Sequence, residues 1–298
     1  MRTQDWVRFI GLCAIWSSSF VFIRICAPAL GVPLTAALRL GIAGLVLVAY
    51  LRVINFDSEW RRHRLLYFKV GLIASALPFT CFAIGGRILP ASLLAIINAC
   101  TPLFGAIFAA RWLGEGFGIK RIVGVGLGLI GVTVANGLGN VDLSSTTLVA
   151  IGITVIAPLC YALAGVFIKL KASHLSHRGV AAWSQLSVAP VALLGLPFAD
   201  PPVTPNLTVV LAMLTLAVLC SAVAYLIFYR LMADIGPTKV TTITFIIPVF
   251  GMLWGNLFLG ETITSGMIIG CLIMIAGTLL VIAPPSIRPA EAKQSTTG

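Results

Sequence analysis

The sequence predicts an all-α integral membrane protein with ten transmembrane helices, arranged as two inverted five-helix repeats with both termini cytoplasmic. Composition gives the first indication. Hydrophobic residues make up 59% of the 298-residue chain and charged residues only 10%, and the mean hydropathy is +1.06. A soluble domain carries about 25% charged residues, so the composition excludes one. A sequence repeat at a spacing of 146 residues gives the second indication.

The predicted spans follow from apolar stretches, since about 20 such residues cross a bilayer. They lie at roughly 6–28, 33–53, 66–86, 91–113, 118–138, 147–171, 177–197, 207–231, 237–259 and 263–284. The first is long for a signal-peptide core and lacks a convincing cleavage site, so we expect a retained helix. The polar segment 286–298 is expected to be a disordered cytoplasmic tail.

Lysine and arginine positions predict the orientation. Most of the 20 basic residues fall on one side of the predicted membrane, as in the 54–65 connection. The predicted loops around Asp142 and Asp200, on the other side, contain none. Basic residues favour the cytoplasmic side, which places both termini inside. The net charge of +11 is therefore explained by orientation rather than by nucleic-acid binding.

The repeat divides the chain into halves at 1–140 and 141–285. Pro102 aligns with Pro248 and Glu115 with Glu261, all separated by 146 residues. Each half has an odd number of spans, so the second half enters the membrane from the opposite side, and a pseudo-two-fold axis lies in the membrane plane. This architecture is typical of carriers that open alternately to each side. The alternative is an ancestral duplication retained for packing.

The matched prolines predict bends near mid-membrane. Proline removes a helical hydrogen bond to the carbonyl four residues before it. Pro102 should free the carbonyl of Asn98, and Pro248 that of Thr244. A free carbonyl at that depth needs protein or a water-filled cavity beside it. We therefore expect both prolines to shape a central cavity, although membrane helices also tolerate proline when their neighbours satisfy the carbonyl.

Four segments resemble the drug/metabolite transporter superfamily, specifically the EamA-type ten-helix permeases. They are "WSSSFVFIR", "LRLGIAGLVL", "TPLFGAIFAARWLGE" and "IPVFGMLWGNLFLGE". The resemblance covers essentially the whole chain. It implies export of small metabolites, such as amino acids or xenobiotics, through a cavity lined by helices 1–4 and 6–9. Helices 5 and 10 are then peripheral.

Polar and aromatic residues within the spans are the cavity candidates. For the serines and aromatics of this set, packing between helices is the alternative interpretation. The candidate substrate residues are Trp16, Ser18, Asn98, Thr101, Pro102, Tyr161, Gln185, Tyr225, Thr244 and Pro248.

Charged residues near the predicted span ends are candidates for gating. Arginine binds carboxylates through two parallel hydrogen bonds, so such residues near the exit are expected to attract a carboxylate-bearing substrate. The structural alternative pairs Glu261 with Arg24 or Arg39, and a plain helix-terminal role for the glutamates also stands. The full set is Arg24, Arg39, Arg87, Glu115, Lys169 and Glu261.

Other kinds of chemistry find little support in the sequence. The GxGxxG match at 126–131 lies inside a predicted membrane helix, so no cofactor is expected. Neither a metal site nor a catalytic residue is expected.

Glycines in helices 5 and 10 favour close helix contacts, either within the chain or between protomers of a homodimer. No Asp or Glu lies mid-span, where proton relays usually have one, which leaves facilitated diffusion or coupling through peripheral glutamates.

The sequence thus predicts a non-enzymatic, multi-pass exporter in the bacterial inner membrane. Its partners are the bilayer and a small neutral or zwitterionic metabolite, with amino acids first and xenobiotics also considered. One alternative is a membrane-embedded enzyme acting on lipid or isoprenoid. Another is a sugar-phosphate or nucleotide-sugar carrier of the same superfamily, which would need basic residues deep in its cavity.

Overall fold

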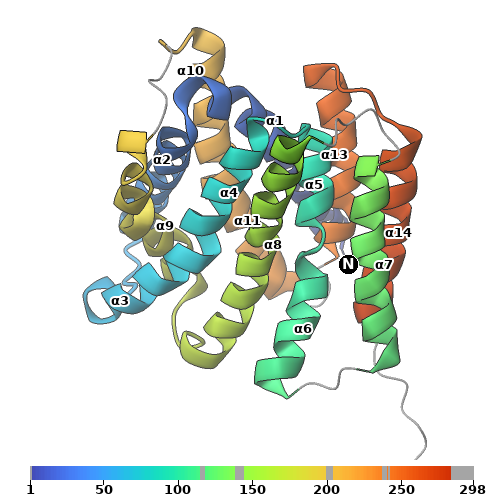
Figure 1. Ribbon diagram of the computed structural model, residues 1–298. Coiled ribbons are helices and arrows are strands. Elements are labelled where there is room, and N and C mark those ends of the chain that lie inside the picture. The colour runs from blue at the N-terminus through green and yellow to red at the C-terminus, as the bar shows by residue number, and fades with distance from the viewer. Residues whose placement is uncertain are drawn as a thin grey trace, which may run out of the picture.

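The computed structural model describes residues 2–114, 118–137, 144–198, 204–236, 240 and 242–282, and within these ranges it contains helices and no strand. The helices form one bundle (Figure 1). Their bounds in the first half are α1 (Thr3–Leu30), α2 (Val32–Val53), α3 (Trp60–Gly71), η1 (Leu72–Ala76), α4 (Leu77–Gly86), α5 (Ala91–Asn98), α6 (Thr101–Leu113) and α7 (Ile119–Gly137). In the second half they are α8 (Ser145–Lys171), α9 (His177–Leu193), η2 (Leu196–Phe198), α10 (Leu207–Leu214), η3 (Thr215–Val223), α11 (Ala224–Ile235), α13 (Ile243–Leu259) and α14 (Ser265–Ile282).

Six helical segments of the described chain are long and apolar enough to cross a membrane: Thr3–Leu30, Val32–Val53, Trp60–Gly86, Ala91–Leu113, Ser145–Lys171 and Leu207–Ile235. Ile243–Leu259 and Ser265–Val281 are shorter apolar helices. A helix rises about 1.5 Å per residue, so these lengths suit a multi-pass membrane protein. The count of ten spans and the cytoplasmic placement of both termini stay predictions.

Helices at equivalent places in the two halves pack against each other. α2 packs on α9, α7 on α14 and α5 on α13. Figure 1 shows α7 and α14 side by side at one edge of the bundle. A two-fold relation between residues 1–140 and 141–285 would produce these pairings, because the helices beside the axis meet their own counterparts. The repeat boundaries themselves remain a prediction.

Glycine explains why α7 and α14 approach so closely. A Cβ built on Gly124 would lie 2.5 Å from the carbonyl oxygen of Gly277, and one on Gly131 would lie 2.6 Å from that of Gly270. Side chains at these positions would push the backbones apart. The glycine faces of these two helices thus meet within the chain. A homodimer, which stays a prediction, would use their other faces.

Two π-helical segments interrupt the bundle at matching places. η1 covers Leu72–Ala76, and η3 covers Thr215–Val223, which includes the positions 146 residues further on. Such wide turns lose regular helical hydrogen bonding and are frequent at functional sites. Ser75 and Ser221 are equivalent residues within them, and both are buried. Cys220 of η3 lines the central cavity.

Candidate functional site

A cavity of about 300 Å³ lies at the centre of the bundle. This volume is at the lower end of the range for small-molecule sites, which is about 300–1,000 Å³. The cavity is lined from α1 by Trp16, Ser19, Phe20 and Ile23, from α2 by Arg39, from α4 by Phe79 and Phe82, and from α5 and α6 by Asn98 and Thr101. From the second half come Tyr161, Cys220, Tyr225, Phe228, Val240, Ile243, Thr244 and Ile247. The family resemblance implied that the seventh predicted span lines the cavity. That span corresponds to α9, which contributes no lining residue.

An aromatic wall follows one face of α1. Trp16 lies 5.1 Å from Phe228 and 6.2 Å from Tyr225, measured between ring centroids. One turn further, Phe20 lies 5.3 Å from Phe82. Ring pairs at such separations are mutually attractive and hold the wall in place. The cavity surface is therefore mainly apolar, with polar groups at a few points.

Arg39 is the basic residue of this cavity. It lies in the second turn of α2, about 10 Å along the helix from Val32, and its side chain is buried, with 7% of the residue exposed. The Nε atom donates to Ser221 Oγ over 3.0 Å. The guanidinium carbon lies 3.7 Å above the ring centre of Phe79, a favourable cation–π geometry.

The surroundings of Arg39 leave its charge unbalanced. Within the described ranges, no carboxylate pairs with Arg39, and none lines the cavity. A buried charge without a counter-ion is costly. Ser221, whose hydroxyl also contacts the carbonyl of Leu216 at 3.1 Å, and Phe79 fix the guanidinium plane. Its remaining donors are thus available to an anionic group inside the cavity.

The two prolines act differently. The helix breaks at residues 99–100, and Pro102 lies in the first turn of α6. The carbonyl of Asn98 accepts a hydrogen bond of 2.7 Å from Thr101 Oγ1, so a neighbouring side chain satisfies it. α13 continues through the buried Pro248 without a break. The expected matching interruptions are therefore found only in the first half, and neither proline lines the cavity.

Besides the two prolines, two other predicted cavity residues, Ser18 and Gln185, lie outside the lining. Ser18 Oγ donates to the carbonyl of Ile15 at 2.8 Å, and Ser19 lines the cavity instead. The helical spacing of Trp16, Ser19, Phe20 and Ile23 could have identified this face. Gln185 is buried, with Nε2 donating to the carbonyl of Ala181 at 2.9 Å and Oε1 without a hydrogen-bond partner in the described structure.

Glu261 caps a helix, which agrees with the helix-terminal alternative rather than with an ion pair to Arg24 or Arg39. Its Oε1 accepts from Ala91 N at 2.6 Å, and its Oε2 accepts from Ser92 N at 3.0 Å and Ser92 Oγ at 2.7 Å. The first backbone N–H groups of a helix lack partners and carry partial positive charge. The start of α5 therefore offers the carboxylate several donors at once, and Arg24 Nη1 donates to the carbonyl of Gly86 at 3.2 Å instead.

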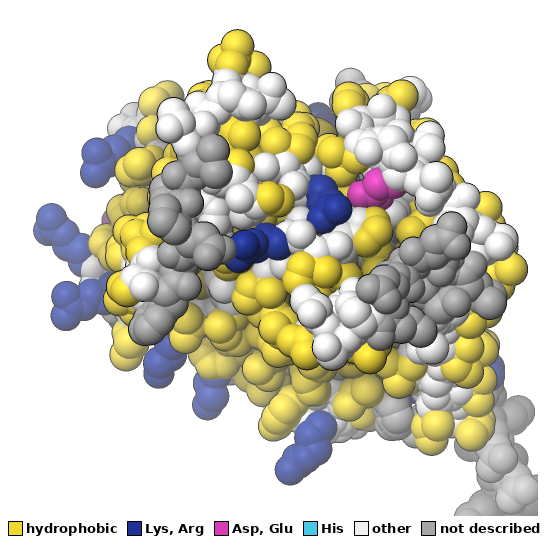
Figure 2. All heavy atoms as spheres, turned by 45° about the horizontal axis from the view of Figure 1, so that its top comes forward, with side chains coloured by type: hydrophobic (Ala, Val, Ile, Leu, Met, Phe, Trp, Pro, Cys, Tyr) yellow, Lys and Arg dark blue, Asp and Glu magenta, His cyan; other side chains and the backbone are white. Residues whose placement is uncertain are grey.

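Two of the remaining charged candidates, Arg87 and Lys169, lie at the ends of different helices. Figure 2 shows the upper end of the bundle, where basic and acidic side chains lie near one another among hydrophobic ones. Arg87 is exposed just after α4, and Lys169 is exposed near the end of α8. Glu115 lies outside the described residues. Whether these residues act as gates stays a prediction.

Sequence reasoning missed the apolar part of the lining, such as Phe79, Phe82 and Phe228. Phenylalanine within an apolar helix carries no signal that separates a cavity wall from packing. Only Phe79 had a potential signal, because a buried arginine on a neighbouring helix requires a partner, but the sequence does not say which aromatic ring meets it.

The comparisons with known proteins agree with a transporter. The family model described as the EamA-like transporter family matches residues 7–137 and 148–283. The chain is 28% identical to the "Uncharacterized transporter YvbV" of Bacillus subtilis, over 87% of this chain and 85% of the relative. It is 26% identical to the "Uncharacterized inner membrane transporter YedA" of Escherichia coli, over 93% and 92%.

Two further matches extend this result. A protein of Salmonella typhimurium named "Probable amino-acid metabolite efflux pump" is 25% identical over 93% of this chain and 94% of its own length. A solved structure described only as the crystal structure of a protein superposes with a TM-score of 0.68, at 16% identity, over 94% of this chain and 96% of the other. That likeness concerns the fold alone. The two family matches together cover most of the sequence, and the chain belongs to the EamA-like transporter family.

Proposed function

We propose that this protein exports small carboxylate-bearing metabolites, amino acids foremost, across the bacterial inner membrane by alternating access. The observation that carries the proposal is Arg39, a buried cation without a carboxylate partner in the described part of the chain. An arginine whose plane is fixed can bind a carboxylate through two parallel hydrogen bonds. The surrounding aromatic wall suits the apolar part of the same molecule.

The family and the names of the relatives support transport rather than catalysis. The name of the Salmonella protein, "Probable amino-acid metabolite efflux pump", is in line with this substrate class. Xenobiotics with a carboxylate would meet the same cavity. The inner membrane is the proposed location, since the Escherichia coli relative is named an inner membrane transporter.

Alternating access would exchange the roles of equivalent residues. Gln185 stands 146 residues after Arg39, and Ser221 stands 146 residues after Ser75. Arg39 lines the cavity, whereas Gln185 is buried with an unpartnered Oε1. When two inverted halves exchange conformations, we expect Gln185 to move toward the cavity and its amide oxygen to gain water or substrate as a partner. The unsatisfied oxygen thus destabilises the present state relative to the other.

Transport by the purified chain in proteoliposomes tests the proposal. Labelled amino acids are compared with their amides, which lack the carboxylate but keep the side chain. The wild type should prefer the acid. Arg39→Gln should raise the KM for the acid by about 10- to 100-fold, as expected for losing hydrogen bonds to a charged group, and should abolish the preference over the amide.

Arg24→Gln is the matched control, because it removes an arginine that contacts the carbonyl of Gly86 and does not line the cavity. Thermal unfolding of each purified variant separates lost binding from lost folding. If Arg39→Gln folds poorly, Arg39→Lys serves as the second variant, because it retains the charge but not the two parallel hydrogen bonds. An unchanged preference for the acid in Arg39→Gln contradicts the proposed role of Arg39.

A sugar-phosphate carrier is the second candidate, because Arg39 also suits a phosphate. The described lining contains a single basic residue, which favours a singly charged group. Adding a hexose phosphate as competitor in the same assay distinguishes the two: strong competition favours the phosphate carrier, and its absence favours the carboxylate exporter.

A further inference from the structure

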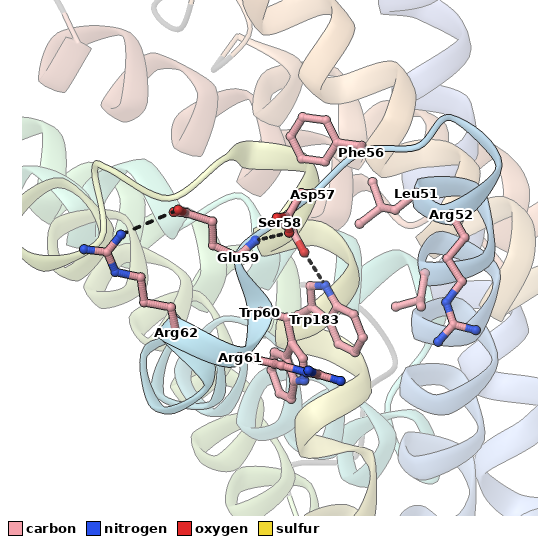
Figure 3. Close-up of a pocket in the computed structure, with 11 residues that line it drawn as sticks. Leu51, Arg52, Phe56, Asp57, Ser58, Glu59, Trp60, Arg61, Arg62 and Trp183 are labelled. Carbon is pink, nitrogen blue, oxygen red and sulfur yellow. Dashed lines mark hydrogen bonds and ion pairs between the residues drawn. The ribbon is translucent and has the colours of Figure 1, made fainter.

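A second hollow, of about 650 Å³, opens at the surface where α2 ends and α3 begins, beside α9 (Figure 3). This groove is separate from the central cavity and shares no lining residue with it. It is lined by Val48, Leu51, Arg52, Phe56, Asp57, Ser58, Glu59, Trp60, Arg61, Arg62 and Trp183. The end of α2, the 54–59 connection and the first residues of α3 thus supply almost the whole surface.

Specific hydrogen bonds build the loop that shapes this groove. Ser58 is held twice, since its carbonyl accepts from Tyr67 Oη at 2.7 Å and its hydroxyl accepts from Trp183 Nε1 at 2.6 Å. Asp57 Oδ1 accepts from Glu59 N at 2.8 Å. The backbone of Glu59 is left-handed, with φ of 50°. A turn tied to both α3 and α9 in this way has a defined shape.

The groove is lined by more positively charged side chains than negatively charged ones. Glu59 Oε1 pairs with Arg62 Nη1 over 3.6 Å, and its Oε2 lies 3.4 Å from His63 Nε2. Arg52 and Arg61 are exposed, and within the described ranges neither has a carboxylate partner. Figure 3 shows Arg62 joined to Glu59 on one side of the loop, while Arg52 extends from α2 on the other. Asp57 also lines the groove, so three arginines face two carboxylates and the groove keeps a net positive charge, with Arg52 and Arg61 outside any ion pair of the described ranges.

The floor of the groove is apolar. Trp60 stacks on Trp183 with ring centroids 4.4 Å apart and an angle of 14° between the planes. Next to the groove, Val53 and Leu65 are 80% and 63% exposed. Tryptophan favours the membrane–water interface, and exposed apolar side chains here suit contact with lipid. A soluble anion would contact the arginines but not the apolar surface, whereas an amphipathic anion would contact both.

We propose that this groove binds the headgroup phosphate of an anionic phospholipid, with Arg52 and Arg61 contacting the phosphate and the tryptophan pair contacting its glycerol and upper acyl chains. Basic pockets at the cytoplasmic ends of membrane helices are suited to such headgroups. The basic 54–65 segment is the one that the sequence predicts to be cytoplasmic. The site is independent of the cargo that the central cavity takes.

The experiment uses the purified full chain in detergent, with lipid binding measured by native mass spectrometry. Phosphatidylglycerol is the anionic probe, and phosphatidylcholine is the zwitterionic one. Wild type should retain phosphatidylglycerol at least 10-fold more tightly. Arg52→Gln/Arg61→Gln should weaken phosphatidylglycerol binding by about 10- to 30-fold, consistent with the attraction per basic residue near an anionic surface. It should weaken phosphatidylcholine binding less, because the choline group offsets the charge of the same phosphate.

The matched control is Arg64→Gln/Lys171→Gln, which removes two exposed basic residues from helix ends outside the groove. It should bind phosphatidylglycerol as wild type does. Equal weakening in both double variants would overturn the proposal in favour of general surface charge. Inorganic phosphate and glycerol phosphate serve as soluble competitors, and displacement of the lipid at equal concentrations would instead identify a free-phosphate site. Unfolding temperatures within about 2 °C of wild type confirm that both variants fold.

Discussion

The carboxylate of Glu261 joins the end of α13 to the start of α5, and its replacement by glutamine tests this link. Ala91 N, Ser92 N and Ser92 Oγ all donate to it, over 2.6, 3.0 and 2.7 Å. Glutamine keeps one acceptor oxygen but turns an NH₂ group toward donors that remain half-buried or buried. It also removes the negative charge from a helix N-terminus.

The expected magnitude follows from these contacts. A hydrogen bond to a charged group contributes about 1.5–3 kcal/mol, and glutamine retains only part of the set, so we expect a loss of about 2–4 kcal/mol for Glu261→Gln. At about 2–4 °C per kcal/mol, the Tm of the purified protein in detergent should fall by about 4–16 °C. Ser92→Ala removes the hydroxyl bond alone and should cost about 1 kcal/mol.

A double-mutant cycle isolates the contact. Glu261→Gln and Ser92→Ala should be non-additive by about 1 kcal/mol, as residues in direct contact are. Amide hydrogen exchange at Ala91 and Ser92 should accelerate in Glu261→Gln. The reasoning fails if Arg24→Gln lowers the Tm as much as Glu261→Gln and the two together lower it no further. That outcome would mean that the carboxylate serves the arginine after all.

Two other predictions concern the bundle itself. Gly124→Ala and Gly131→Ala should each destabilise the protein by about 1–3 kcal/mol, as overpacking does, because their Cβ atoms would meet carbonyl oxygens of α14. Gly126→Ala, with no atom within 4 Å of its Cβ, is the control and should leave the Tm equal or higher; a similar loss in all three would show that helix contact is not the cause. Gln185→Leu removes the unpartnered buried Oε1 and should raise the Tm while slowing transport, because it stabilises the present state; unchanged transport would contradict the exchange of roles between Arg39 and Gln185.

The sequence was sufficient for the class of protein and for the family. An apolar composition with short connections predicts membrane-spanning helices, because backbone groups inside a bilayer must form hydrogen bonds within their own segment. The repeat, visible in Pro102 with Pro248 and in Glu115 with Glu261, predicted matching halves. Arg39 was also found from sequence alone, since a charge within a membrane span is conspicuous.

Tertiary structure decided which partner each of these residues meets. Arg24 and Arg39 were the partners that the sequence offered for Glu261, yet its carboxylate accepts from the N-terminus of α5, which offers several donors at once. Ser19 rather than Ser18 lines the cavity because the rotation of α1 is set by packing. Gln185 lies outside the cavity lining, although its counterpart Arg39 is part of it. The sequence shows which residues are polar and how far along its predicted membrane span each one lies. Rotation about a helix axis and the choice between competing donors depend on contacts between distant segments, which only the folded bundle determines.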